Sequence, residues 1–263
     1  MLKIVGYLII IAVIFIFKKI PRAKDLNKYE LLDDEPARLF KFLDNSVSSD
    51  DKRINAYFRK IKPSLIEEIK MADVVVGCVA WLTDKEILEA LSEKKAVSII
   101  VQKEDFLRPD TDTIYYLKKW KSEMRCRYDG LKGNLNRDMF RNILSRVSTN
   151  SVAPIEAVRC VGYNKSKSSI CPRMHNKFLL FCKLVKEYDE QSDDEPKIVL
   201  PYAVWTGSFN LTKNANNSLE NALLIKDMKI VRAFFKEYGQ ICAISEPLDW
   251  KSKWVEPEWR IGT

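Results

Sequence analysis

The chain has 263 residues, of which 46% are hydrophobic and 30% are charged, with only 8 glycines and 10 prolines. This composition excludes a collagen-like, low-complexity or disordered chain and leaves a globular protein that can bury a sizeable core. The net charge of +8 favours a polyanionic partner such as nucleic acid or anionic lipid. Two segments carry the excess: residues 18–24, with four basic and no acidic side chains, and residues 114–146, with nine basic and three acidic ones.

Residues 1–17 contain a single charged side chain, Lys3. As a helix they would span about 26 Å, close to the ~30 Å hydrocarbon core of a bilayer. No small-residue cleavage site follows, because the chain continues directly into basic residues. The pattern predicts a transmembrane anchor over residues 1–20. The basic residues on its C-terminal side predict a single-pass membrane protein whose main domain faces the cytoplasm.

The segments that follow are more polar. Residues 21–52 are predicted to be a tether with one short amphipathic helix at 36–43, because a proline opens an apolar, helically spaced patch. From 53 to 71 the apolar positions keep a helical period that Pro63 interrupts. We therefore expect helical structure on both sides of this proline.

The main domain is predicted to be α/β, with a mixed central sheet flanked by helices. A continuous apolar run at 72–82, a helix opened by Asp84 and a second apolar run at 96–102 indicate a parallel strand–helix–strand crossover. The later elements are predicted as strands at 155–162, 176–182, 198–206 and 221–226 and a helix at 227–243. An acidic stretch at 187–195 is predicted to be a solvated loop. The domain is expected to cover residues 53–245, with 246–263 as a C-terminal tail.

Residues 103–150 form a basic, aromatic-rich insertion in this pattern. Basic side chains follow phosphates and aromatic rings stack on bases, so the segment suits single-stranded nucleic acid. The candidate substrate-binding residues are Lys118, Lys119, Trp120 and Lys121. The alternative is a solvated helical hairpin, in which Leu117, Trp120 and Met124 share a packing face.

The only histidine, His175, precedes Lys177 at the start of a predicted strand. Alternation along a strand directs both side chains to one face. Ser208 and Asn210 follow the next strand with the same two-residue spacing, and Glu220 precedes the strand after that. Alone, such a histidine is more often structural and such a glutamate is equally consistent with a solvated loop. Together they predict a site for cleavage of a phosphodiester: the neutral imidazole attacks phosphorus, the lysine and asparagine hold non-bridging oxygens, and the carboxylate orients the imidazole.

These groups require no metal or other cofactor. A zinc site at Cys160, Cys171 and His175 has suitable ligand types, but its C-x10-C-x3-H spacing matches no closed structural site. The six cysteines show no C-x-x-C pairing. Free thiols in a reducing compartment are therefore favoured over a disulfide framework.

The segments H-N-K and G-S-F-N with the downstream glutamate resemble the phospholipase D superfamily, whose signature is H-x-K-x4-D-x6-G-S-x-N followed by Glu. His175, Lys177, Gly207, Ser208, Asn210 and Glu220 match this pattern. Cys182 stands where the family has Asp, and 29 residues instead of 11 separate the lysine from the glycine.

The chain carries one such motif, so it resembles the single-motif branch, which includes small bacterial endonucleases and Zucchini-like enzymes. This resemblance implies a homodimer in which two copies of His175 share one site, one as nucleophile and one as acid. The leading hypothesis is a membrane-tethered, metal-independent endonuclease acting on DNA or RNA through a phosphohistidine. The alternatives are a phospholipase D-type hydrolase of anionic, cardiolipin-like phospholipid and a catalytically silent nucleic-acid-binding protein.

Overall fold

The computed structural model describes residues 25–28, 30–33, 38–41, 43–103, 115–145, 153–162, 173–186 and 197–248. The predicted anchor at 1–20, the acidic loop at 187–195 and Cys171 lie outside these ranges. Within them, no helix is long and apolar enough to cross a membrane. The chain divides into two units, one of residues 1–42 with 217–219 and one of residues 43–216 with 220–263.

The first unit contains a short 3-10 helix, η1 (Leu26–Lys28), and an antiparallel hairpin of β1 (Glu30–Asp33) and β2 (Arg38–Lys41). The helix predicted at 36–43 is therefore wrong, since its centre is a strand. Its apolar residues Leu39 and Phe40 pair with Leu32 and Leu31 across the hairpin. Pairing with a second strand satisfied the backbone of a segment too short to form a stable helix alone.

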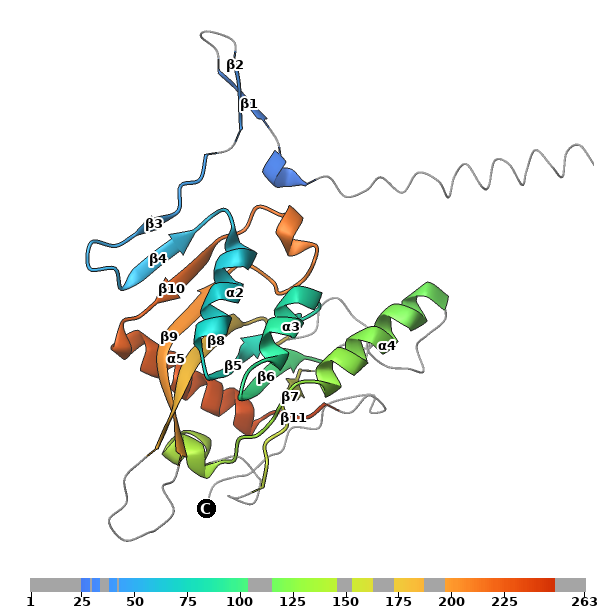
Figure 1. Ribbon diagram of the computed structural model, residues 1–263, viewed down its shortest axis with the longest axis vertical. Helices are drawn as coiled ribbons and strands as arrows, with labels where there is room; N and C mark the ends of the chain where they lie inside the picture. The colour runs from blue at the N-terminus through green and yellow to red at the C-terminus, as the bar shows by residue number, and fades with distance from the viewer. Residues whose placement is uncertain are drawn as a thin grey trace, which may run out of the picture. The chain divides into compact units, whose positions relative to one another are not determined.

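The second unit contains one sheet, whose nine described strands run in the order β11-β7-β6-β5-β8-β9-β10-β4-β3 (Figure 1). Their bounds are Val47–Ser48 (β3), Ile54–Tyr57 (β4), Val74–Val79 (β5), Ala96–Gln102 (β6), Val158–Val161 (β7), Lys177–Lys186 (β8), Lys197–Gly207 (β9), Ala222–Ile225 (β10) and Glu246–Pro247 (β11). β5, β6 and β7 are parallel, and every other pairing is antiparallel. The predicted mixed sheet and its parallel crossover are confirmed.

Two boundaries differ from the prediction. The helical period expected from residue 53 begins only with α2 (Ile61–Met71), because Ile54–Tyr57 is a strand paired with β10. Pro63 lies at the third position of α2, where a missing N–H costs no helical hydrogen bond. Glu246 and Pro247, assigned to the tail, pair with β7 and so belong to the sheet.

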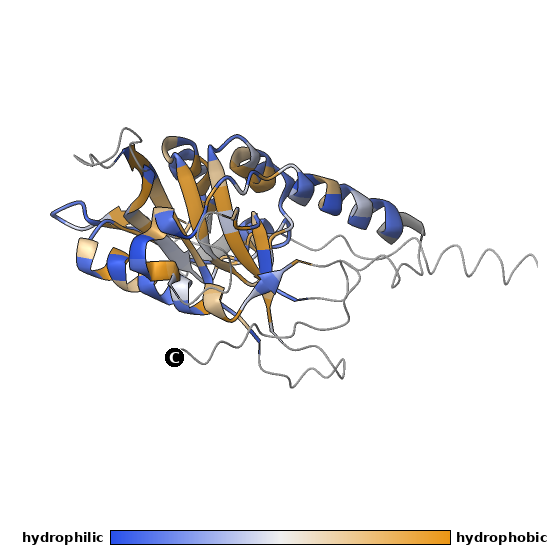
Figure 2. Ribbon diagram, turned by 90° about the horizontal axis from the view of Figure 1, so that it is seen from below, coloured by the Kyte–Doolittle hydropathy of each residue, from blue (hydrophilic) through white to orange (hydrophobic). Residues whose placement is uncertain are grey.

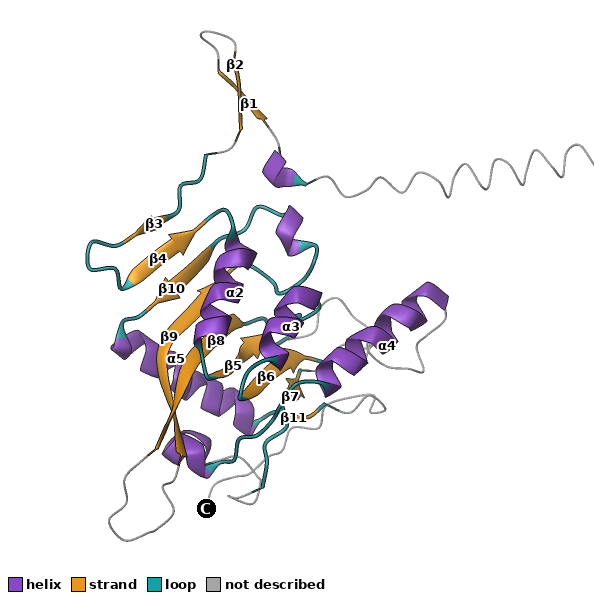
Figure 3. Ribbon diagram, in the orientation of Figure 1, coloured by secondary structure: helices purple, strands orange, loops and turns teal. Residues whose placement is uncertain are grey.

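Helices cover both faces of the sheet (Figures 1 and 3). One buried cluster joins the sheet to α2, α3 (Lys85–Ser92) and α4 (Tyr115–Asp129). The other joins it to the 3-10 segment η4 (Asp138–Leu144) and α5 (Met228–Ala243). Alternation within β5 divides its side chains between them, with Val75 and Val79 in the first cluster and Val74, Val76 and Cys78 in the second.

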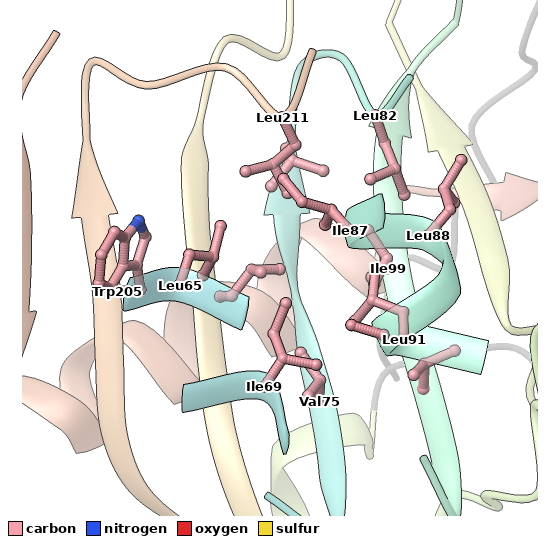
Figure 4. Close-up of a cluster of buried hydrophobic side chains, with 14 of the residues drawn as sticks. Leu65, Ile69, Val75, Leu82, Ile87, Leu88, Leu91, Ile99, Trp205 and Leu211 are labelled. Carbon is pink, nitrogen blue, oxygen red and sulfur yellow. The ribbon is translucent and has the colours of Figure 1, made fainter. Parts of the chain in front are cut away.

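The sheet is the most hydrophobic layer, and α4 is largely hydrophilic (Figure 2). Figure 4 shows the side chains that α2 and α3 direct onto the sheet: Leu65, Ile69, Ile87, Leu88 and Leu91. Helix α3 begins where the sequence predicts, because the Asp84 carboxylate accepts the backbone N–H groups of Glu86 and Ile87 at 3.0 and 3.2 Å.

Candidate active site

The candidate catalytic residues lie at one end of the central strands of the sheet, where two strands end and two begin. β5 ends at Val79, which is paired with Lys177, the first residue of β8. β9 ends at Gly207, which is paired with Ala222, the first residue of β10. Since β8 and β9 are antiparallel neighbours, the start of one lies beside the end of the other. The loops that carry the two halves of the motif therefore meet.

His175 and Lys177 are in contact, as their spacing predicts. The Lys177 Nζ lies 3.2 Å from each imidazole nitrogen, and it donates a hydrogen bond of 3.0 Å to the His175 carbonyl oxygen. Partial desolvation of the exposed imidazole, together with the positive charges of Lys177 and Arg173, lowers the pKa of His175. The neutral imidazole, which is the form that can attack phosphorus, is therefore favoured at neutral pH.

The lysine is also perturbed. Burial lowers the pKa of Lys177, whereas the negative charge of Glu220 opposes that shift. Glu220 comes from the loop before β10, so a charge from the second half of the motif acts on the lysine of the first. A cation at this position can stabilise the negative charge that develops on a phosphoryl group.

The segment before His175 is held by a side chain that sequence analysis did not identify. Gln102, at the end of β6, is 3% exposed. Its Oε1 accepts the Met174 N–H at 2.8 Å, and its Nε2 donates to the Lys103 carbonyl at 3.1 Å. Gly162 has φ of +122°, and a side chain at that position would collide with the Gln102 amide. The last residue of β6 and the start of the motif are thus joined through a buried amide.

Ser208 and Glu220 are joined directly. The Ser208 hydroxyl donates to the Glu220 carboxylate and accepts the Asn221 N–H at 3.0 Å, while the Ser208 N–H donates to the Asn221 carbonyl at 3.1 Å. The prediction that Glu220 orients the imidazole is not what the structure shows. Among the described residues, no hydrogen bond joins Glu220 to His175, and the carboxylate instead holds Ser208.

The turn that carries Ser208 depends on glycine. Gly207 has φ of +157°, and a Cβ there would collide with the Asn221 carbonyl. Two residues after Ser208, the Asn210 Oδ1 is buried and has no hydrogen-bond partner among the described residues. Within the part of the chain that the structure describes, this oxygen therefore makes no hydrogen bond that stabilises the fold. That is the condition expected of a group that binds a ligand.

The rest of this loop is fastened to the α3 side of the sheet. Leu211 forms a parallel bridge with Leu82, and its carbonyl accepts the N–H groups of Thr83 and Asp84 at 2.8 and 2.9 Å. Figure 4 shows Leu211 and Leu82 near the first turn of α3. The Asn216 amide donates to the Asp84 carboxylate at 3.0 Å. The helix cap of α3 therefore also positions the G-S-F-N loop.

Cys182, at the position of the family's Asp, is completely buried within the cluster beneath α5. Burial raises the pKa of its thiol far above the usual range, so the side chain is neutral. The thiol lies 3.8 Å from the Leu180 carbonyl. The departure from the signature thus lies in the core, five residues along β8 from Lys177.

Trp81 is a further residue that sequence analysis did not select. Its ring is edge-to-face with the imidazole of His175, with centroids 5.5 Å apart and planes at 80°. The sequence places it in an apolar run, where it reads as one more core residue. Only the pairing of β5 with β8 shows that it lies beside the histidine.

The four residues proposed on the insertion have different environments. Lys118 and Lys119 are exposed on α4, whereas Lys121 is only 5% exposed, so it is not available on the surface as predicted. Trp120 packs against the core, and Met124 is fully buried. The packing face proposed as the alternative is therefore present, and the exposed lysines lie on the other side of the helix.

Neither a metal cluster nor a disulfide is found in the described parts of the chain. They contain no group of three or more His, Cys, Asp or Glu side chains arranged to hold a metal ion. The cysteines at 78, 160, 182 and 242 are buried and Cys126 is exposed, and none of these forms a disulfide.

No family model matches the sequence. The Acanthamoeba polyphaga mimivirus protein named "Uncharacterized protein L381" is 33% identical over 209 residues, which cover 77% of this chain and 69% of that protein. The chain belongs to the L381 family.

The structure is similar to solved structures that include members of the phospholipase D superfamily. NucT from Helicobacter pylori matches with a TM-score of 0.42 and 14% identity, covering 74% of this chain and 98% of that one. Nuc from Salmonella typhimurium, described as a phospholipase D family member, matches with a TM-score of 0.39 and 17% identity, covering 71% of this chain and 91% of that one. Phosphatidylserine synthase from Haemophilus influenzae matches with a TM-score of 0.37 and 14% identity, covering 81% of this chain and 44% of that one.

Proposed function

We propose that this member of the L381 family is a phosphodiesterase of the phospholipase D type, acting as an endonuclease on DNA or RNA. The observation that carries the proposal is the contact between His175 and Lys177, with Ser208 and Glu220 on the adjoining strand ends. A low-pKa imidazole beside a cation is suited to nucleophilic attack on phosphorus. The groups involved need no metal for this step.

In the proposed reaction, one imidazole nitrogen of His175 attacks the phosphorus and a P–N bond forms. The P–O bond to the leaving group breaks, and the leaving oxygen takes a proton from an acid on the opposite side. Water then attacks the phosphohistidine: a new P–O bond forms, the P–N bond to His175 breaks, and the water gives up a proton to the same acid–base group, so that both groups return to their starting states. Lys177 and Asn210 would hold the non-bridging oxygens throughout.

If the acid is a second histidine, it comes from another copy of the chain, because each chain has a single histidine. We therefore include a homodimer in the proposal, with the partner's His175 as the acid. Mixing His175→Ala chains with wild-type chains should depress activity more than simple dilution does. A strictly monomeric protein with full activity would contradict the shared site.

Nucleic acid is favoured as substrate by the exposed lysines of α4. Replacing Lys118 and Lys119 with alanine should weaken nucleic-acid binding and reduce its salt dependence by about two counterions' worth of slope. The matched control is the replacement of Lys229 and Lys236, which are exposed on α5, across the sheet. If both double variants respond equally to salt, the α4 lysines make no specific contribution.

Anionic lipid is the second candidate substrate, supported by the apolar segment 1–20 and the basic residues that follow it. Membrane tethering through this segment is part of the proposal on sequence grounds. The full chain should be incubated in EDTA with labelled single-stranded DNA, RNA and cardiolipin vesicles. Cleavage of the nucleic acids is expected, and hydrolysis of only the lipid would favour the phospholipase.

The decisive variant is His175→Ala, measured on whichever substrate is cleaved. Loss of the nucleophile should cost several kcal/mol of barrier, well over a hundred-fold in rate. The variant should stay folded, because His175 is exposed and outside both core clusters. Retention of more than about a tenth of the activity, a loss below ~1.4 kcal/mol, would rule out the phosphohistidine mechanism.

A further inference from the structure

Arg173 lies on the same side of the chain as His175. Met174, between them, is 9% exposed and belongs to the cluster beneath α5. Its N–H donates to the buried Oε1 of Gln102 at 2.8 Å, so both its backbone and its side chain are held by the core. Arg173 and His175 are both exposed. The buried methionine therefore separates two side chains that face the solvent at the start of the motif.

Arg173 adds a second positive charge to the site. The charges that lower the pKa of His175 are those of Lys177 and Arg173, so the guanidinium is within electrostatic reach of the imidazole. In the part of the chain that the structure describes, no carboxylate forms an ion pair with Arg173. Glu220 instead acts on Lys177 and accepts the Ser208 hydroxyl. An exposed cation whose charge is not neutralised beside the nucleophile favours an anionic ligand.

The two cations of this segment have different positions relative to the nucleophile. Lys177 is partly buried and its Nζ lies 3.2 Å from the imidazole nitrogens, as a group that holds the reacting phosphate should. Arg173 is exposed, and among the described residues no hydrogen bond joins it to His175. Its planar guanidinium matches the geometry of a phosphate, to which it can donate two parallel hydrogen bonds. Arg173 is therefore suited to a phosphate beside the reacting one.

We propose that Arg173 binds the phosphate next to the scissile phosphate of a nucleic-acid strand. This inference rests on the proposed function and narrows its substrate to a chain of consecutive phosphodiesters. Contacts with phosphates fix the register of a strand but do not read its bases, so Arg173 would add affinity without sequence preference. A substrate with a single phosphate has no group for this subsite.

The test compares dinucleotides that share one scissile linkage. TpT has a single phosphate, whereas pTpT and TpTp carry a second one on the 5′ or the 3′ side. With the full-length wild-type protein, one of these added phosphates should raise kcat/KM about 5- to 10-fold over TpT, as expected of a charge-assisted hydrogen bond. Arg173→Gln should abolish this gain, and Arg173→Lys should keep part of it. The matched control is Arg232→Gln on the exposed side of α5, which should keep the full gain.

The ratio between substrates separates phosphate binding from an effect on the nucleophile. If Arg173 acts only through the imidazole, its replacement changes kcat/KM equally on all three dinucleotides and leaves the ratio as in wild type, which would overturn the proposal. Urea unfolding of each variant checks that it is folded.

Lipid substrates provide a second comparison, because cardiolipin has two phosphates and phosphatidylglycerol has one. A preference for cardiolipin vesicles that Arg173→Gln abolishes, with no such effect on the dinucleotides, would assign the second phosphate to a lipid. That result would overturn the proposal of a nucleic-acid strand.

Binding keeps the test independent of catalysis. In a His175→Ala background, fluorescence anisotropy of a short single-stranded oligonucleotide should show that Arg173→Gln reduces the salt dependence of binding by about one counterion's worth of slope, and that Arg232→Gln does not. If the wild-type protein cleaves no phosphodiester but this difference is present, the proposed function fails and the phosphate subsite stands. If cleavage occurs while the slope and the substrate ratio are unchanged, the proposed function stands and the subsite fails.

Discussion

Replacing Gln102 should test how the fold holds the nucleophile. Gln102→Met keeps the length of this 3% exposed side chain but removes both of its hydrogen bonds. Loss of the acceptor for the Met174 N–H at 2.8 Å should cost about 1–3 kcal/mol, because that N–H is buried. Loss of the bond to the Lys103 carbonyl should add about 0.5–1.5 kcal/mol. We therefore expect a decrease of about 2–4 kcal/mol in the free energy of unfolding.

The same change should reduce activity, because Met174 directly precedes His175. A displacement of a catalytic group by about 1 Å can cost about 100-fold in rate, so kcat/KM should fall about 10- to 100-fold. Stability is measured by urea unfolding and activity on the substrate that the wild type cleaves. The control is Gln240→Met on the exposed side of α5, which should change stability by less than about 0.5 kcal/mol. If the two variants are equally stable and equally active, the buried amide does not position the site.

Cys182→Asp, which introduces the residue that the phospholipase D signature has at this position, should destabilise the protein by about 3 kcal/mol or more in urea unfolding, because it puts a carboxylate into a fully buried site. Cys182→Ala should cost less, and an equally stable Asp variant would contradict this reasoning. Asp84→Ala should cost about 2 kcal/mol, since it removes the cap of α3 and the acceptor of Asn216, whereas Asp84→Asn should cost less because it can keep the cap. Lys177→Met should move the acidic limb of the pH profile of kcat/KM to higher pH. The lysine's charge lowers the pKa of His175, and protonation of the imidazole removes the nucleophile. If the limb does not move, a group other than His175 determines its position.

Local patterns in the sequence were sufficient for the central elements of the fold. The apolar runs at 72–82 and 96–102 predicted β5 and β6, and Asp84 correctly predicted the start of α3. The contact of His175 with Lys177 also follows from local geometry, because two residues in an extended chain bring their side chains to one face. The superfamily resemblance rests on the same short-range spacing.

Partners distant in sequence decided the remaining elements. Residues 54–57 became a strand because β10, at residues 222–225, pairs with them, and no local window of sequence contains that information. Lys121 carries a charge that predicts exposure, yet its position on the packed side of α4 buries it. Strand pairing and helix packing are long-range contacts, and they override weak local preferences.

In the candidate active site, too, the sequence determined some features and the tertiary structure determined others. Residue types and spacing determined that an imidazole, a lysine, a hydroxyl, an amide and a carboxylate could act on a phosphodiester. Only the tertiary structure decided their contacts: Glu220 holds Ser208, Gln102 holds the segment before His175, and Trp81 lies against the imidazole. The contacts of Gln102 and Trp81 join the ends of strands that are far apart in the chain. Their geometry is set by the order and register of strands in the sheet, which short-range spacing does not encode.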